Sequence, residues 1–301
     1  MNIIDIIADN KRREVEAMKQ IVSAERLFAL ARQLKRQPLS LKGALRGNYS
    51  GVIAEFKRRS PAKGSINPTA DVASVVSGYA QHGAAACPFV TDSRFFSGSL
   101  TDLAIARRCV HIPLLRNDFM VSKYQIAEAY VYGADAVMLI ASILTLEEIE
   151  AMMVVAHDFG MEALVEIHSE REIAKIPACT DLVGVNNRNL SNFSVNADVA
   201  YNLISRIPDR FLRIAEGGIS SHTALHRLRS IGYNGFLIGE NFMKKDDPAE
   251  AMNTFIHPQH YDNSSIHPNN RKPHTLSPHL QQHCPKSTKR LECAFSDNLM
   301  G

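Results

Sequence analysis

The stretch YGADAVMLIA (132–141) shows the pattern that decides the fold, because a short turn leads directly into an unbroken apolar run over residues 136–141. A strand that is apolar at every position, rather than at every second one, suits a parallel sheet covered on both faces. Similar turns at His82-Gly83 and at residues 231–234 also precede apolar runs. Such turns are typical of the connection from a helix to the next strand.

Seven more apolar runs share this character and are separated by intervals long enough for one crossover helix. They are GVIAEF (51–56), AACPFV (85–90), HIPLL (111–115), EALVEI (162–167), LVGV (182–185), FLRIA (211–215) and GFLI (235–238). An open doubly wound sheet more often has five or six strands and a glycine-rich first turn, and the chain contains no GxGxxG motif. We therefore predict an α/β fold, a closed (β/α)8 TIM barrel over residues 49–256.

The segment before the first run, residues 1–48, predicts an N-terminal extension of one or two helices that covers the bottom or rim of the barrel. Its first part is amphipathic and carries charges from Asp5 onward, so it is neither a signal peptide nor a membrane span. We expect its apolar residues to lie near one face of a helix. They are Ile3, Ile6, Ile7, Val15 and Met18.

The composition changes abruptly after Ile256. Residues 257–301 hold six of the twelve histidines and five prolines but few large apolar side chains. Such a segment cannot bury enough surface to offset its ordering entropy, so we predict a disordered tail. Metal binding through His257 and His260, or through His279, His283 and Cys284, is the alternative, although a histidine-rich tract meets these spacings easily. An appended, non-native sequence is a third interpretation.

Composition and charge limit the possible partners. The 301 residues are 45% hydrophobic and 22% charged, with a formal net charge of +3. This balance is too small to favour nucleic acid or a membrane surface, but it allows an anionic small molecule. The five cysteines are scattered without a CxxC pair, which argues against a metal site or a disulfide framework and favours the cytoplasm. We expect no metal and no cofactor.

The residues that follow the apolar runs are the candidates for chemistry. In a (β/α)8 barrel the loops after the strands converge at one end, while the interior is packed. Nearly every run here ends in a polar, charged or glycine residue, and the joint presence of carboxylates with lysine and arginine exceeds what strand ends need. These residues are Glu55, Lys57, Thr91, Asp92, Arg116, Asn117, Asp118, Ser142, Glu166, Asn186, Asn187, Arg188, Glu216, Gly217, Gly218, Gly239 and Glu240.

Glycines mark the last two of these strand ends, in AEGGIS (215–220) and IGEN (238–241). Exposed backbone N–H groups at such turns bind anions, and in barrels the loops after strands seven and eight commonly bind phosphate. Glycines that only form turns are the plainer interpretation. We expect a phosphate site at Gly217, Gly218, Gly239 and Glu240, with Lys57 nearby.

Several longer motifs occur together in one order. They are IAEFKRRSPAKG (53–64), FFSGSLTDL (95–103), PLLRNDFM (113–120), KYQIAEA (123–129), GADAVMLIA (133–141), LVEIH (164–168), VGVNNRNL (183–190) and FLIGENFM (236–243). Over roughly residues 1–255 the chain resembles the indole-3-glycerol phosphate synthases of tryptophan biosynthesis. The resemblance implies ring closure of 1-(2-carboxyphenylamino)-1-deoxyribulose 5-phosphate with loss of carbon dioxide and water.

That reaction needs a general acid at the sugar carbonyl and a further acid or base to remove the hydroxyl as water. The resemblance implies that the catalytic residues are Glu55, Lys57, Asn117, Glu166, Asn186 and Glu216, with Glu166 serving in the dehydration. It implies that Lys57 lies near the phosphate, that Arg188 holds an anionic group, that Ser60 contacts substrate and that Phe96 lines the pocket of the aromatic ring.

Three positions depart from the family's pattern. Asn117 stands where the family has the lysine that acts as general acid in ring closure, and an amide cannot deliver a proton. Arg116 is a poor substitute because it points to the other side of a regular strand. Gly217 replaces a serine, which removes a hydroxyl and keeps the turn. Pro88 lies inside the second strand and predicts a local bulge or lower stability.

The leading hypothesis is an active, monomeric synthase that binds an anionic small molecule and neither nucleic acid nor membrane. The first alternative is a catalytically weakened or inactive barrel that binds the same phosphosugar ligand, as Asn117 would allow. The second is a related phosphosugar isomerase such as phosphoribosylanthranilate isomerase. The segments around Glu55 and Asn186 favour the synthase.

Overall fold

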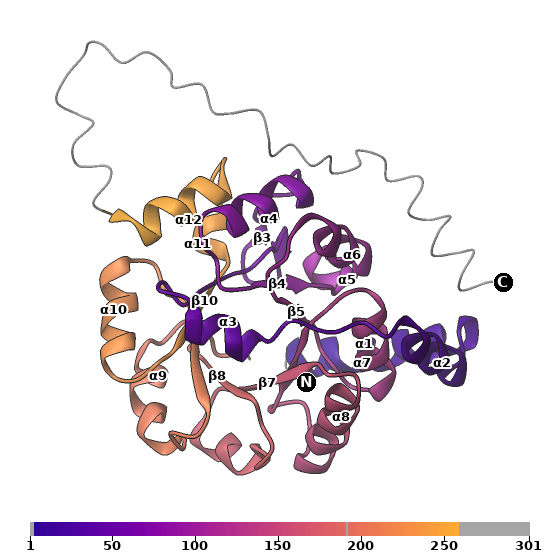
Figure 1. The fold of residues 1–301 in the computed structure, drawn as a ribbon. Coiled ribbons are helices and arrows are strands. Elements are labelled where there is room, and N and C mark those ends of the chain that lie inside the picture. Colours follow the sequence, from indigo (N-terminus) through magenta and orange to yellow (C-terminus); the bar gives the residue numbers. More distant parts are fainter. Residues whose placement is uncertain (1–2, 191, 259–301) are drawn as a thin grey trace, which may run out of the picture. The chain divides into compact units, whose positions relative to one another are not determined.

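The computed structural model describes residues 3–190 and 192–258, which form a barrel of eight parallel strands (Figure 1). The strands are β1 (Val52–Ala54), β4 (Cys87–Val90), β5 (Leu114–Asn117), β6 (Ala136–Ile140), β7 (Glu162–Ile167), β8 (Leu182–Asn186), β9 (Leu212–Glu216) and β10 (Gly235–Ile238). Each pairs with its neighbour in chain order, and β10 pairs with β1. Single bridges between Ile53 and Ala86 and between Phe56 and Phe89 join β1 to β4. The predicted TIM barrel is confirmed.

Helical segments connect the strands from β3 (Gly64–Ser65) onward, and the last two of these segments follow β10. They are α4 (Val72–Gln81), α5 (Ser93–Phe96), α6 (Leu100–Cys109), α7 (Lys123–Val131), α8 (Leu146–Asp158), the 3-10 helices η1 (Glu170–Lys175) and η2 (Ile204–Arg206), α9 (Asp198–Leu203), α10 (His222–Ser230), α11 (Glu240–Met243) and α12 (Pro248–Ile256). Polar caps fix several of their starts. Thr145, for example, accepts from the backbone N–H of Glu148, whose side chain accepts from the backbone of Thr145 in return.

A small antiparallel hairpin follows β1 and was not predicted. It consists of β2 (Arg59–Ser60) and β3 (Gly64–Ser65). Strands of two residues give no periodicity in the sequence, so only the structure reveals them. The hairpin matters for the site because it carries the RRSPAKG segment to the rim of the barrel.

Apolar side chains fill the interior of the barrel. One buried cluster joins inward residues of most strands, including Ile53, Leu115, Met138, Leu164 and Ile214. Leu41 and Leu45 of the N-terminal extension belong to the same cluster. The barrel therefore has a packed core rather than a channel, and any ligand site has to lie at one end.

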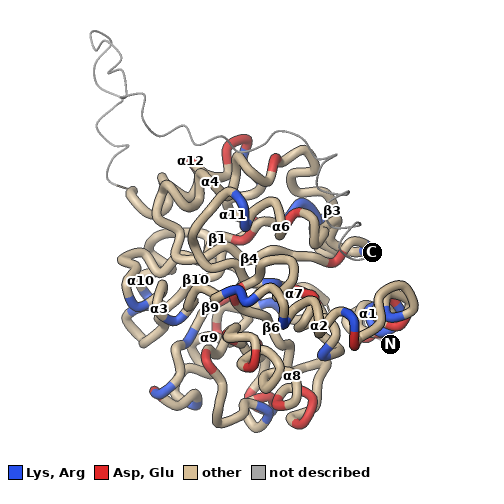
Figure 2. The backbone as a smooth tube through the Cα atoms, turned by 45° about the vertical axis from the view of Figure 1, so that its right-hand side comes forward, with Lys and Arg blue, Asp and Glu red and all other residues tan. Residues whose placement is uncertain are grey.

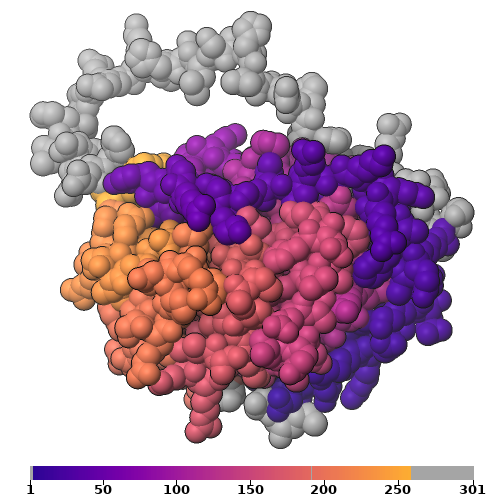
Figure 3. Space-filling model, turned by 60° about the horizontal axis from the view of Figure 1, so that its bottom comes forward, coloured from indigo at the N-terminus to yellow at the C-terminus, as the bar shows by residue number. Residues whose placement is uncertain are grey.

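The N-terminal extension consists of three helices, so the prediction of one or two was wrong. They are α1 (Ile3–Ile21), α2 (Ala24–Leu34) and α3 (Leu41–Gly47). In Figure 1, α3 crosses the end of the barrel that faces the viewer. Figure 3 shows the extension as an indigo and purple band over the barrel and along its side. It covers the bottom through α3 and reaches the opposite end through α1, whose Ile4 and Ile7 border the main pocket.

The buried face of α1 differs from the expected one. Residues Ile4, Ile7, Ala8, Lys11 and Val15 are buried, a spacing that follows the period of a helix. Ile6 is 43% exposed and Met18 is 39% exposed. The error arose because the prediction grouped apolar residues only, whereas the true face contains a lysine.

Lys11 is buried because acidic groups surround its amine. The amine lies 2.9 Å from Asp92, 3.3 Å from Asp118 and 2.8 Å from Glu14. Burial opposes the charge on Lys11, but these carboxylates outweigh it and raise the lysine pKa. Asp118 is also held by Arg116 at 3.0 Å. An ionic network therefore fastens α1 to the loops that follow β4 and β5.

Pro88 does not produce the predicted bulge. The register runs without interruption from Cys87 opposite Leu114 to Val90 opposite Asn117. On the side of β1, the bridges at residues 86 and 89 have the same offset from their partners. Proline has no backbone N–H, so pairing with β1 is limited to these isolated bridges. Pro88 therefore reduces the number of hydrogen bonds between β1 and β4 and does not insert an extra residue into β4.

In the view of Figure 2, lysine and arginine positions are interspersed with aspartate and glutamate positions along the backbone. Among the described residues no helix is long and apolar enough to cross a membrane. The predicted disordered tail and its candidate metal ligands lie outside the described residues, apart from His257.

Candidate active site

A pocket of about 560 Å³ opens at the carboxyl ends of the strands. Its lining includes the terminal residues of six strands, which are Val90, Asn117, Ile140, Asn186, Glu216 and Ile238. Every predicted site residue lines it: Glu55, Lys57, Ser60, Phe96, Asn117, Glu166, Asn186, Arg188, Glu216, Gly217, Gly218, Gly239 and Glu240. The structure therefore brings together side chains that the sequence places far apart.

One wall of the pocket is apolar. Phe96, after β4, and Phe119, after β5, lie with ring centroids 5.9 Å apart. Ile4 and Ile7 of α1 and Leu190 after β8 add to the lining. Apart from Phe96, these residues were missed, because an apolar side chain in a loop or terminal helix carries no sequence signal for a site. This wall suits a flat aromatic group.

The loop after β9 forms an anion-binding turn at another part of the pocket. Gly217 and Gly218 both have φ of +77°, in the left-handed region that favours glycine. A Cβ on Gly217 would lie 2.7 Å from the side-chain oxygen of Asn186. A serine at this position would therefore be strained. Successive backbone N–H groups in such a turn can face an anion.

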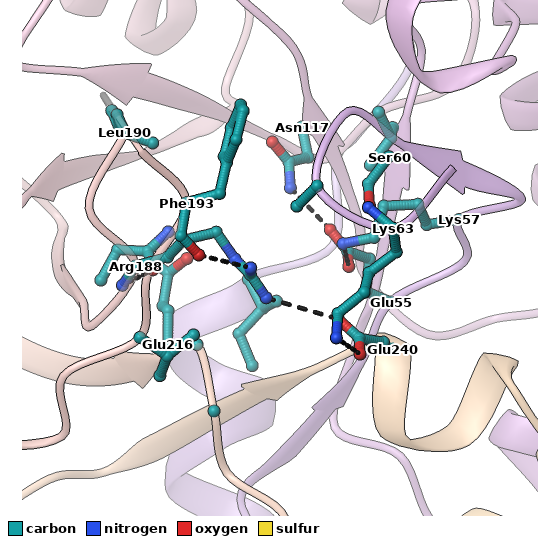
Figure 4. Close-up of a pocket in the computed structure, with 18 of the residues that line it drawn as sticks. Glu55, Lys57, Ser60, Lys63, Asn117, Arg188, Leu190, Phe193, Glu216 and Glu240 are labelled. Atoms are coloured by element: carbon teal, nitrogen blue, oxygen red, sulfur yellow. Dashed lines mark hydrogen bonds and ion pairs between the residues drawn. The ribbon is translucent and has the colours of Figure 1, made fainter. Parts of the chain in front are cut away.

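Two cations from different loops meet Glu240 at the mouth of the pocket, as Figure 4 shows. Arg188 lies 3.4 Å from the Glu240 carboxylate, and Lys63 of the β2–β3 hairpin region lies 3.5 Å from it. Arg188 also donates to the backbone carbonyl of Phe193 at 3.1 Å. Because all three charged side chains are partly exposed, an incoming anion can compete with Glu240 for the two cations.

Glu55, Lys57 and Asn117 form a second group, below the hairpin (Figure 4). The amine of Lys57 lies 2.5 Å from one oxygen of Glu55, and the amide of Asn117 donates to the other oxygen at 2.9 Å. A Cβ at position 239 would overlap the Glu55 carboxylate, so Gly239 provides the space for it. Each oxygen of Glu55 thus has one hydrogen-bond partner from the protein.

Glu166 and Glu216 form a buried pair of carboxyl groups on β7 and β9. Burial, together with the neighbouring Glu166, holds the pKa of Glu216 well above its usual range. Burial would also raise the pKa of Glu166, but His168 outweighs it and holds that pKa below its ordinary value. A Cβ at Gly184 would overlap Glu216, so β8 has a glycine beside this side chain. Of the two, Glu216 therefore holds a proton more tightly, and Glu166 ionises first.

Asn186 and His168 fix the ionised member of this pair. The amide of Asn186 donates to Glu166 at 3.0 Å, and its oxygen accepts from the backbone N–H of Arg188 at 2.9 Å. The imidazole Nε2 of His168 lies 3.2 Å from the other oxygen of Glu166. His168 was not predicted as a site residue, because it lies behind Glu166 and does not line the pocket.

Other polar residues at the strand ends serve the framework. Arg116 points away from the pocket, as expected, and binds Glu128 at 2.8 Å and Asp118 at 3.0 Å. Thr91 donates to Asp118 at 2.6 Å. Within residues 3–190 and 192–258, no group of three or more histidine, cysteine, aspartate or glutamate side chains is arranged to hold a metal ion.

Comparison with known proteins places these motifs in a family. The family model described as "Indole-3-glycerol phosphate synthase" matches residues 4–255. Indole-3-glycerol phosphate synthase of Bacteroides thetaiotaomicron is 41% identical over 255 residues, covering 85% of this chain and 98% of the relative. The enzyme of Sulfurimonas denitrificans is 38% identical over 254 residues, covering 83% and 97%.

Solved structures share the fold at low sequence identity. The 3-hexulose-6-phosphate synthase of Salmonella typhimurium has a TM-score of 0.54 at 13% identity and covers 70% of this chain and 99% of its own. A chain of the tryptophan synthase complex of Pyrococcus furiosus has a TM-score of 0.51 at 14% identity and covers 69% and 96%. These similarities support the barrel alone.

Proposed function

The chain belongs to the indole-3-glycerol phosphate synthase family, and from that premise we propose that its pocket closes the indole ring with Glu216 as the acid and Glu166 as the base. The substrate is 1-(2-carboxyphenylamino)-1-deoxyribulose 5-phosphate, and the products are indole-3-glycerol phosphate, carbon dioxide and water. The chain is thus a decarboxylating lyase of tryptophan biosynthesis. The observation that carries the assignment is the buried carboxyl pair, whose two members have pKa values shifted in opposite directions.

The pocket offers a place for each part of this substrate. The phosphate occupies the turn at Gly217 and Gly218 with the backbone at Gly239 and Glu240, near Lys57. The aromatic ring lies against the wall of Phe96 and Phe119. The carboxylate on the aromatic ring replaces Glu240 as the ion-pair partner of Arg188, because a planar guanidinium binds carboxylates well and the Arg188–Glu240 pair is partly exposed.

Glu216 starts the reaction as a neutral acid. It donates its proton to the sugar carbonyl oxygen while the aromatic carbon attacks the carbonyl carbon, so a carbon–carbon bond and a hydroxyl form together. Loss of carbon dioxide then returns the bonding electrons to the ring. A positioned general acid contributes roughly 10²- to 10⁴-fold in rate.

Dehydration completes the ring. Glu166 removes the proton from the ring carbon next to the hydroxyl-bearing carbon, and Lys57 donates a proton to the hydroxyl as it leaves as water. Two protons leave the enzyme and one returns, so one proton from solvent restores the resting state. That proton balances the carboxylate lost as carbon dioxide. Asn186 and Glu55 orient the two participating groups.

Asn117 stands where the family has a lysine, and like a lysine it can donate a hydrogen bond to Glu55. Its amide occupies one oxygen of Glu55 and leaves the other to Lys57. It delivers no proton, which is why the proposal assigns the first proton transfer to Glu216.

The first test is the fluorescence of indole-3-glycerol phosphate when the purified chain meets substrate. We expect product from the unaltered chain and a loss of kcat of about 10²- to 10⁴-fold in Glu216→Gln, with KM changed by no more than about threefold. Glu150→Gln, on the exposed face of α8, is the matched control. Tight binding of substrate with a flat fluorescence trace would instead identify a barrel that binds the ligand without turnover.

The second test places a lysine at position 117. In the unaltered chain Asn117→Lys should raise kcat by less than about tenfold, because Glu216 already supplies the proton. In the Glu216→Gln background the same change should recover most of the loss, within the roughly 10²- to 10⁴-fold worth of a general acid. A gain of a hundredfold or more in the unaltered background would remove Glu216 from the role of first acid.

Two further parts of the proposal are a cytoplasmic location, which the scattered cysteines favour, and a monomeric state. Sedimentation at working concentration tests the second. A dimer would contradict it.

A further inference from the structure

His168 lies behind the carboxyl pair, between two acidic side chains. Its Nε2 atom is 3.2 Å from Glu166, and its Nδ1 atom is 3.4 Å from Glu172 of η1. The His168 side chain is only 9% exposed. Glu172 is itself held in place, since it accepts from the backbone N–H of His168 at 2.8 Å and from the Ser169 hydroxyl at 3.0 Å.

The surroundings of His168 determine its charge. Glu166 on β7 and Glu172 on η1 face it directly, and Glu216 on β9 faces it across Glu166. Burial opposes the imidazolium, but the two adjacent carboxylates outweigh burial and raise the pKa of His168 to about 9. The same interactions lower the pKa values of Glu166 and Glu172. At neutral pH the side chains of Glu172, His168 and Glu166 form a row of alternating charge.

A pair of neighbouring carboxyl groups that share one proton has no inherent preference for which member keeps it. Here a cation lies beside Glu166, whereas Glu216 is influenced most strongly by the charge of Glu166 and more weakly by those of Glu55 and Lys57. The arrangement is therefore unsymmetrical, and the proton belongs on Glu216.

We propose that His168, held by Glu172, is a positioning residue that keeps Glu166 ionised and thereby leaves Glu216 as the proton donor. His168 does not line the pocket and acts only through Glu166. The inference rests on the proposed function, because it explains how the acid and base of that reaction are kept apart.

The first experiment follows the pH dependence of kcat in His168→Gln. Without the imidazolium, ionisation of Glu166 should require a higher pH, so the acidic limb of the profile should move up by about one pH unit or more. KM should change by less than about twofold. His157→Gln is the matched control. His157 also pairs with a carboxylate, since its Nε2 atom lies 2.7 Å from Asp181, but this pair does not line the pocket. A loss of rate that is equal at every pH, or an unchanged profile, would overturn the proposal.

Glu172→Gln is the second variant and leaves the imidazole in place. It should shift the acidic limb in the same direction by a smaller amount, because His168 then holds its proton less firmly. An acidic limb identical to that of the unaltered chain would contradict the role given to Glu172.

A third measurement does not depend on turnover. The ¹⁵N signals of the His168 ring, identified by their absence in His168→Gln, should titrate with a midpoint near 9. The midpoint of this titration should move toward neutral pH in Glu172→Gln. A midpoint at or below about 6.5, the ordinary value for histidine, would refute the positioning role even in an active enzyme. The expected midpoint in a chain that makes no product would place the failure in the proposed function instead.

Discussion

Replacing Lys11 with methionine removes the cation that joins α1 to the rim of the pocket. The lysine amine lies within 3.3 Å of Asp92, Asp118 and Glu14. Asp118 keeps Arg116 and Thr91 as partners, but Asp92 keeps only the backbone N–H of Phe95, at 2.7 Å. Removing one partner of a buried ion pair costs about 3–5 kcal/mol, because the remaining charge is left without compensation.

The loss is comparable with what holds α1 in place. The helix buries Ile4, Ile7 and Val15, and each such side chain contributes about 1.5–3 kcal/mol when fully buried. Their sum is about 5–9 kcal/mol before the entropy of ordering the helix is subtracted. We therefore expect Lys11→Met to release α1 locally while the barrel stays folded, which takes Ile4 and Ile7 away from the pocket.

Two assays separate release of α1 from other outcomes. Amide hydrogen exchange in α1 should become faster by at least tenfold with little change in the barrel, and KM should rise more than kcat falls. Lys19→Met, which breaks an exposed pair with Glu16 on the same helix, should do neither. Adding Asp92→Asn should recover part of the protection, because it removes the stranded charge. Unchanged exchange together with an unchanged KM would refute the reasoning.

Three further predictions concern single positions. Gly217→Ser should raise KM and lower stability by about 1–2 kcal/mol, because φ there is +77° and the new Cβ approaches Asn186; a KM equal to that of the unaltered chain would show that the turn adapts. Gly184→Ala should lower kcat at least tenfold, because its methyl group overlaps Glu216, and a crystal structure with Glu216 unmoved would contradict this. His168 stabilises the fold at pH values below its unfolded pKa and loses this contribution as the pH rises toward about 9. Denaturant unfolding between pH 6.5 and 9.5 should therefore show a decline of about 2–3 kcal/mol that is absent in His168→Gln; parallel curves would count against it.

The sequence was most informative where burial is continuous. The apolar runs at residues 162–167 and 235–238 coincide with β7 and β10, because these strands are covered on both faces. The run at 111–115 ended too early, since β5 continues to Asn117. Arg116 is charged yet buried, which its partners Glu128, Asp118 and Thr91 make possible, and all three lie outside β5.

In the site, too, local features could be predicted from the sequence, and features that depend on distant partners could not. Residues directly after a strand could be predicted, because the topology of a parallel barrel brings all strand ends together. Ile4 and Ile7 could not, since their place in the pocket depends on how α1 docks, and the docking depends on a buried lysine. His168 directly follows β7, the strand that carries Glu166, but its role depends on Glu172, whose position is set by a 3-10 helix without periodic signal.

The distribution of cations among the pocket carboxylates explains how ring closure can proceed with an amide at position 117. Lys57 compensates the charge of Glu55, and His168 compensates that of Glu166. No cation in the described part of the chain lies within ion-pair distance of Glu216, which is buried beside an existing negative charge. Burial without compensation is the condition under which a carboxyl group keeps its proton at neutral pH. A lysine at position 117 would add a positive charge beside Glu55 but would leave Glu216 buried beside Glu166, so we expect the proposed acid to stay at Glu216 with either side chain at position 117.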